Sequence, residues 1–315
     1  MVVLLIPAFL LLAPHVSLAW GPATHIKLAS DVLEQLGILA PAMAALLARH
    51  ARDFIFGNIA ADVVFAKKLS RVKQFCHQWS TAFAILDSAR TEPTRAFACG
   101  YLTHLAADTV AHNKFLPRQM TLTRSTVSFG HLYWELRADS AIGTHYWNRL
   151  RDVLDDHFEQ HETVLAQKLT DTLLPFQWNR AIFYRLNNMI SRNGWIRAMD
   201  AWYHRSRWEL PDDVLADYRN ECVDRALDVL NRMQASPVVR DDPNGTTAFG
   251  YTRARRRQFR QMARIGILYP HVLTEAIARQ APAVNPRNGR DRRPLPGAPV
   301  VRVPVPADCP PPAAP

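Results

Sequence analysis

Apolar residues recur along most of the chain at the spacing of an α-helix. In the segment 24–37, for example, Ile26, Ala29, Val32 and Leu36 fall on one helical face. The same pattern predicts further helices over 41–50, 53–65, 79–90, 93–113, 129–141, 147–172, 178–192, 194–207, 212–234 and 252–278. No β-hairpin signal is convincing, so the sequence predicts an all-α protein.

The segment 97–115 carries an unusual polar stripe. His104, Asp108 and His112 are four residues apart, so they line one helical face that drifts by about 40° per step. Their neighbours are mostly small or apolar, which indicates a buried helix. Buried ionisable groups are costly unless compensated, and a metal ion would compensate these, because His and Asp both bind zinc. The alternative is a stripe that faces solvent or forms hydrogen bonds within the core.

Further candidate ligands lie on both sides of this helix. His131 and Glu135 form a second pair four residues apart, and Asp62, His77 and His25 precede the central stripe. Together with that stripe they are too many for one tetrahedral site. They are suited to a cluster of metal ions.

The second half of the chain has no comparable pattern of ligands. His157 and His161 are also four residues apart, but Asp155 and Glu159 are among several acids beside them and indicate an exposed polar face. The segment 241–245, Asp-Asp-Pro-Asn-Gly, is a loop by composition.

The two ends of the chain differ in composition from the middle. Residues 1–19 are apolar and end in Ser-Leu-Ala, which predicts a cleaved signal peptide and a mature chain that begins at Trp20. We therefore expect a secreted or periplasmic protein that is soluble. Residues 20–280 are expected to form one large domain. Residues 281–315, rich in Pro and Arg without periodicity, are expected to be disordered.

Charge and cysteines leave several interpretations open. The formal net charge is +10, and part of it is concentrated in arginines between Arg253 and Arg264 with no acid among them. Such a patch suits anionic lipid headgroups, nucleic acid or the cell envelope, and equally a solvated helix face. Four cysteines permit at most two disulfides, whose connectivity the sequence does not give: Cys76, Cys99, Cys222 and Cys309.

The ordered set of candidate ligands resembles that of the zinc-dependent phospholipase C family. The resemblance covers roughly residues 20–139 and extends to the catalytic domain of glycosylphosphatidylinositol-specific phospholipase D and, more distantly, to single-strand-specific S1/P1 nucleases. These are all-α proteins that hold three zinc ions. By this resemblance, the amino group and carbonyl of Trp20 would bind one ion together with His25 and Asp108. Asp108 would bridge to a second ion, which would also be bound by Asp62, His77 and His104, and the third would be bound by His112, His131 and Glu135.

The resemblance implies a phosphodiesterase that acts on phospholipids or at a membrane surface. Asp62 is the candidate to orient or deprotonate the attacking water, and the alternative is that it serves only as a ligand. The interval between His104, Asp108 and His112 matches the phospholipase D-like branch. The position after Asp62, aromatic in phosphatidylcholine-cleaving members, is Val63 here, so specificity for choline is not implied. A nuclease acting on nucleic acid and a zinc-stabilised binding or envelope protein are the alternatives. No stable protein partner is predicted.

Overall fold

A computed structural model describes residues 20–64, 75–123, 127–156, 158–170, 172, 174–203, 206, 208 and 210–265. The regular elements of these residues are helices, with no strand among them, so the predicted all-α class is confirmed. The first half contains α2 (Pro22–Glu34), η1 (Leu36–Ile38), α3 (Pro41–Arg49), α4 (Ala51–Ala60), η2 (Ala61–Val63), η4 (Phe75–His77), α5 (Trp79–Ser88) and α6 (Glu92–Val110). The rest contains η5 (Ala111–Phe115), α7 (Leu116–Thr123), α8 (Val127–Ser140), α9 (Thr144–Leu154), α10 (Glu159–Lys168), α11 (Phe176–Ile190), α12 (Asn193–Tyr203), α13 (Asp212–Arg232), η6 (Met233–Ala235), η7 (Pro237–Arg240) and α14 (Thr246–Arg264).

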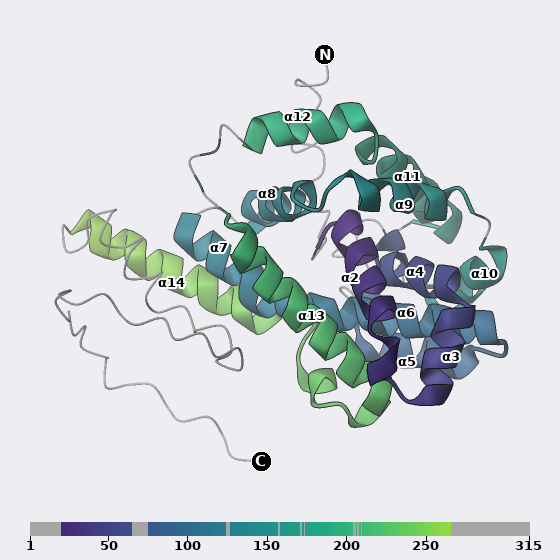
Figure 1. Cartoon of the computed structure of the whole chain (residues 1–315). Coiled ribbons are helices and arrows are strands. Elements are labelled where there is room, and N and C mark those ends of the chain that lie inside the picture. The colour runs from purple at the N-terminus through teal and green to yellow at the C-terminus, as the bar shows by residue number, and fades with distance from the viewer. Residues whose placement is uncertain are drawn as a thin grey trace. The chain divides into compact units, whose positions relative to one another are not determined.

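Helix α6 lies at the centre of the core, packed against α4, α5 and α13 (Figure 1). The Thr91 side chain caps its first turn by accepting a hydrogen bond from the backbone N–H of Thr94. Every residue from 96 to 110 is buried, as the apolar sequence around the polar stripe predicted. The helix continues into the π-helical η5, a wide turn of the kind often found at functional sites.

Two glycines allow α4 and α6 to touch through their backbones. A Cβ atom on Gly57 would lie 2.0 Å from the carbonyl oxygen of Phe97, and one on Gly100 would lie 2.0 Å from that of Phe54. Any larger residue at either position would push the helices apart. This close contact places the carbonyl of Asn58 beside His104 on α6.

Some predicted helices differ from the observed ones. The segment 147–172 is two helices, α9 and α10, and α7 was not predicted. The expectation that His161 lies on an exposed face was wrong: its side chain is fully buried, bonds Asp53 through Nε2 at 2.6 Å and stacks on Phe97. The acidic neighbours of His161 misled the interpretation, because residues one or two positions away on a helix point in other directions.

Several predictions fall on residues outside the described part. These are the signal peptide 1–19, the helix beyond residue 265, the tail 281–315, His157 and Cys309, so the predicted domain boundaries stay predictions. Cys99 and Cys222 are buried free thiols. Within the described residues, every helix is too short or too polar to cross a membrane.

Candidate metal centre

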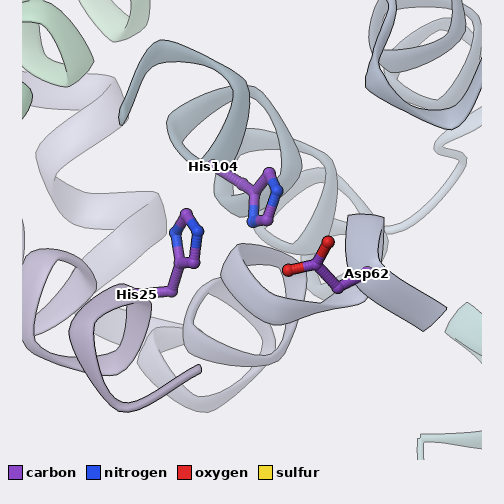
Figure 2. Close-up of side chains that lie close together, drawn as sticks. All are labelled: His25, Asp62 and His104. Carbon is purple, nitrogen blue, oxygen red and sulfur yellow. The ribbon is translucent and has the colours of Figure 1, made fainter. Parts of the chain in front are cut away.

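Five predicted ligands from four elements meet around α6, and we call them the histidine–aspartate cluster. The donor atoms of His25, Asp62 and His104 lie within 4.8 Å of one another, as do those of His77, His104 and Asp108. His25 comes from α2, Asp62 from η2 and His77 from the end of η4. Figure 2 shows the Asp62 carboxylate pointing toward the two imidazoles of His25 and His104. Those two rings are stacked with centroids 3.9 Å apart.

The separations between donor atoms match the edges of a metal coordination shell. The Nε2 atoms of His77 and His104 are each 3.3 Å from Oδ2 of Asp108 and 3.1 Å from one another. Nε2 of His77 is also 3.3 Å from Oδ1 of Asp62. Ligands about 2.0–2.1 Å from a tetrahedral zinc ion lie about 3.3 Å apart, so these atoms are spaced as if around such an ion.

The remaining three predicted ligands form a second set, the histidine–glutamate group. His112 from η5 and His131 and Glu135 from α8 bring their donor atoms within 4.8 Å. The Nε2 atoms of the two histidines are 3.3 Å apart, and Nε2 of His131 is 2.8 Å from Oε1 of Glu135. His112 thus separates from His104 and Asp108, with which it shares the polar stripe in the sequence. A drift of about 40° per step, followed by the wide turn of η5, accounts for the separation.

The ionisation of the cluster favours a bound cation. Burial opposes ionisation of Asp108, but His104, His25 and His77 hold the pKa of this carboxyl well below its usual range. Burial lowers the pKa of His25, and the charge of His104 lowers it further. Burial opposes a charge on His104, but Asp108 and Asp62 raise the pKa of this imidazole. Metal ions require a carboxylate and a neutral imidazole, so a bound cation would take the place of the His104 proton.

Unsatisfied polar atoms also fit a metal. Both ring nitrogens of His25 and both carboxylate oxygens of Asp108 are buried without a well-directed hydrogen bond within the described residues, and the histidine nitrogens 3.3–3.5 Å from Asp108 are themselves candidate ligands. Buried polar atoms of this kind are normally paired, and each one left without a partner is destabilising. The residues present therefore fit a cationic cofactor of the zinc type.

Backbone carbonyls orient two of the histidines. Nδ1 of His104 donates to the carbonyl oxygen of Asn58 at 2.8 Å, and Nδ1 of His112 donates to that of Pro243. Because a carbonyl oxygen only accepts, the proton of each neutral ring is on Nδ1. Nε2 of each ring therefore presents a lone pair to its set of ligands, as is usual for metal-binding histidine.

The loop 241–245 supports both sets, a role that no sequence pattern indicates. Besides the Pro243 contact, the Asn244 side chain donates to the backbone carbonyl of His77 at 2.9 Å. Gly245 has φ +61°, and a Cβ atom there would lie 2.4 Å from the carbonyl oxygen of His112. The Asn-Gly dipeptide predicted the turn, but nothing in the sequence indicated that this turn packs against ligands more than a hundred residues earlier.

The start of the predicted mature chain is anchored beside the cluster. Trp20 is fully buried and stacks on Phe115 with ring centroids 4.7 Å apart. The carboxylate of Asp139, on α8, accepts hydrogen bonds from the backbone N–H groups of Ala23 at 3.1 Å and Thr24 at 2.9 Å. Burial raises the pKa of Asp139 to about 7. The binding of metal by the amine and carbonyl of Trp20 stays a prediction.

A cavity of about 480 Å³ lies beside the cluster and is lined by His77, Trp79, Arg240 and Asn244, among others. The indole N–H of Trp79 donates to the carbonyl of Asp241 at 3.0 Å and so fixes one wall. The cavity combines an aromatic face with charges of both signs, because Asp241 and Asp242 line it together with Arg240, next to a candidate metal ligand.

Comparison with known families identifies one match. A family model described as zinc dependent phospholipase C matches residues 24–190. No curated protein and no solved structure matches the chain. The matched range includes every predicted ligand except Trp20, and it ends before the loop 241–245.

Proposed function

We propose that this chain, which belongs to the zinc-dependent phospholipase C family, hydrolyses phosphodiester bonds of phospholipids at a centre of three zinc ions. Family membership supports phospholipase C-like hydrolysis in general. The observation that carries the finer proposal is the spacing of donor atoms, about 3.3 Å in both sets of ligands. Eight side chains from distant segments converge in this way.

In this proposal, zinc supplies the activated water and Asp108 helps to hold the ions. When bound, zinc polarises phosphoryl oxygens and lowers the pKa of a coordinated water from 15.7 to about 7. Asp108 contacts three histidines of the cluster, and these contacts support it as the residue that two ions would share. A carboxylate there would keep its negative charge and would offset the repulsion between two cations.

Asp62 is the candidate to handle the proton of the attacking water. Its side chain is 5% exposed, whereas that of Asp108 is fully buried. A general base needs access to the water it deprotonates, and the more accessible carboxylate meets that condition better. The substrate would be a phospholipid. Its headgroup is left open, because Val63 stands at the position after Asp62 where the phosphatidylcholine-cleaving members have an aromatic residue.

Export is part of the proposal. Removal of residues 1–19 in a secreted or periplasmic protein would free the amine of Trp20, which precedes the first turn of α2. That amine would then complete the ligands around His25. The buried, stacked position of Trp20 supports this role, because it holds the new terminus in place.

The test combines metal analysis with substrate assays. Protein that begins at Trp20 is compared with protein that carries two extra residues before Trp20, and bound zinc and hydrolysis are measured for both. We expect three zinc ions and phospholipid hydrolysis for the first, and one ion fewer with loss of activity for the second. Equal zinc content in the two proteins would remove Trp20 from the ligands.

The choice of substrates separates the alternatives. Phosphatidylcholine, phosphatidylethanolamine, phosphatidylglycerol and single-stranded DNA are assayed side by side with the zinc-loaded protein. Hydrolysis of DNA alone would make the protein a nuclease. Full zinc content without hydrolysis of any substrate would make it a zinc-stabilised binding protein.

A further inference from the structure

Helix α14 carries charge of one sign only. Its sequence from Thr246 to Arg264 contains six arginines and no acidic residue. Like charges three or four residues apart on a helix repel one another and destabilise it. A helix that keeps such a sequence is therefore unlike the other long helices, α6 and α13, which contain acids as well as bases.

Four of these arginines form a continuous exposed row. Arg253, Arg257, Arg260 and Arg264 follow one another at intervals of four, three and four residues, and all four are exposed. At 3.6 residues per turn they fall within a sector of about 60°, along about 16 Å of helix. No ion pair joins any of them to another residue of the described chain. We call them the arginine row.

Apolar side chains flank the arginine row on the exposed half of α14, about 110–150° round the helix from the centre of the row. Tyr251 is 65% exposed, and Ile265, just past the helix, is 67% exposed. Both are among the few large hydrophobic residues that the described surface exposes to this degree. The guanidinium of Arg255 lies near the rings of Tyr251 and Phe259, 6.0 and 5.5 Å from their centroids. Basic side chains next to exposed aromatic and aliphatic groups are typical of helices that lie on a membrane surface.

The same helix begins at the metal centre. Phe249, in its first turn, is buried with its ring centroid 5.6 Å from that of His112 and 5.3 Å from that of His131. From there α14 packs against α7 and η5, and its far end extends past α7 (Figure 1). A surface bound by the arginine row would thus lie on the element that contacts the histidine–glutamate group.

We propose that α14 docks the protein on an anionic phospholipid surface through the arginine row, with Tyr251 and Ile265 entering the headgroup region. This inference rests on the proposed function, because it gives a reason for a lipid-hydrolysing centre to sit at the base of a basic helix. Anionic headgroups neutralise a row of positive charges without requiring a groove. Single-stranded nucleic acid is the other polyanion, but its binding normally uses a basic groove with several stacking aromatics, and the exposed aromatic beside this row is Tyr251 alone within the described residues.

The experiment measures binding of the zinc-loaded protein to vesicles by co-sedimentation, with lipid hydrolysis followed in the same samples. Vesicles of phosphatidylglycerol mixed with phosphatidylcholine are compared with vesicles of phosphatidylcholine alone. In the row variant, Arg253, Arg257, Arg260 and Arg264 are all changed to Gln. Each basic residue near an anionic surface strengthens binding roughly five-fold, so we expect the row variant to bind mixed vesicles at least about 100-fold more weakly. The wild type should bind them far better than phosphatidylcholine alone.

A matched control removes the same amount of charge elsewhere. Arg95, Arg185, Arg192 and Arg197 are exposed on other helices and connections, and all four are changed to Gln in the control variant. We expect the fold-loss of vesicle affinity in the control variant to be less than about one tenth of that in the row variant. The reason is that salt screening confines the attraction to charges within about 10 Å of the lipid surface. Equal losses in the two variants, or no loss in the row variant, would overturn the proposal.

Further measurements keep the outcomes separate. Zinc content and melting temperature are measured for both variants, and a milder pair, Arg253→Gln with Arg257→Gln, replaces the row variant if that fails to fold. A row variant that loses binding to single-stranded DNA but keeps binding to mixed vesicles would also overturn the proposal. Hydrolysis of a soluble short-chain phospholipid by the wild type tests the proposed function by itself. Vesicle binding that depends on the arginine row, without that hydrolysis, would support docking and refute the phospholipase activity.

Discussion

The two sets of candidate ligands differ in how far along the chain the carbonyl that orients their polar-stripe histidine lies, although Asn244 also contacts His77 of the cluster. In the histidine–aspartate cluster, His104 is oriented by Asn58, 46 residues earlier, across the contact between α4 and α6. In the histidine–glutamate group, His112 is oriented by Pro243, 131 residues later, in the loop before α14. The first support lies inside the segment that matches the zinc-dependent phospholipase C family, and the second lies outside it.

This difference suggests separate routes to weakening the centre. The cluster depends on the packing of buried helices around α6, so changes there affect the stability of the fold as well as metal binding. The group depends on the turn before α14, in which Pro243 and Gly245 are buried against His112, so changes there affect metal binding more than the packing around α6. Each arrangement also depends on a glycine, Gly100 between the helices and Gly245 in the turn, which allows the two to be compared directly.

The largest expected effect comes from replacing the shared carboxylate. Asp108→Asn should remove two of the three proposed zinc ions and lower kcat/KM by more than about 100-fold. Loss of a residue that only hydrogen-bonds a metal ligand already lowers activity by up to about 100-fold, and Asp108 is itself a proposed ligand. Glu135→Gln should remove only the ion of the histidine–glutamate group. Bound zinc and phospholipid hydrolysis are measured for both variants, with the exposed Asp87→Asn as control. Retention of all zinc by Asp108→Asn would contradict a shared carboxylate.

The next largest effect is expected from Gly100→Ala. The added methyl group would lie 2.0 Å from the carbonyl oxygen of Phe54, so α4 and α6 must separate. Overpacking of this kind destabilises a fold by about 1–3 kcal/mol, and here it should also weaken zinc binding in the cluster. The measurement is denaturant unfolding with and without zinc.

Gly250→Ala is the matched control for Gly100→Ala. Gly250 is also helical, but a Cβ atom there would have no neighbour within 4 Å. Alanine at such a position stabilises a helix by roughly 0.5–1 kcal/mol. If Gly100→Ala were as stable as this control, the close contact between α4 and α6 would not be needed to hold His104.

A more local effect is expected from Gly245→Ala. The positive φ and the short distance to the carbonyl of His112 would both resist a Cβ atom, so the turn must move away from η5. We expect the zinc of the histidine–glutamate group to bind about 10–100-fold more weakly, with a smaller effect on the cluster, which this turn contacts through Asn244 and the backbone of His77. Competition with a coloured chelator gives the affinity of each site.

Gly143→Ala separates backbone strain from loss of contact. Gly143 has φ +85° and a Cβ atom there would meet nothing within 4 Å. The positive φ should cost both Gly143→Ala and Gly245→Ala about 1–2 kcal/mol of stability. Gly143→Ala should show no change in zinc affinity. A fall in zinc affinity in this control would mean that strain, and not the contact with His112, explains the Gly245→Ala result.

The smallest effect is expected from Asp139→Ala. Asp139 follows Glu135 by one turn of α8 and caps the first turn of α2, so it connects the elements that carry Glu135 and His25. Loss of a helix cap costs about 1 kcal/mol, which the melting temperature would detect. Ser140→Ala is the control, because its hydroxyl bonds only a carbonyl within α8. Equal melting temperatures of the two variants would show that the cap adds nothing.

Much of the fold and of the candidate site could be predicted from the sequence, because the core residues and the candidate ligands recur at the period of an α-helix. The intervals of His104 to Asp108 and of His131 to Glu135 place donors on one side of a helix whatever surrounds it. The buried character of α6 followed from the small and apolar residues around the stripe. The break between α9 and α10 and the burial of His161 did not follow, because they depend on neighbours from other segments.

The amino-acid sequence by itself determined the helical class, the identity of the candidate ligands and their order, since these depend on residue type and local period. No local pattern gives the division of the ligands into two sets: the family resemblance implied it, and the tertiary structure decided it. The split of His112 from His104 and Asp108 arises from the turn of η5, and the orientation of His112 arises from a loop far along the chain. The physical reason is that a hydrogen bond or a close backbone contact between distant segments leaves no periodic pattern, whereas a helical face does.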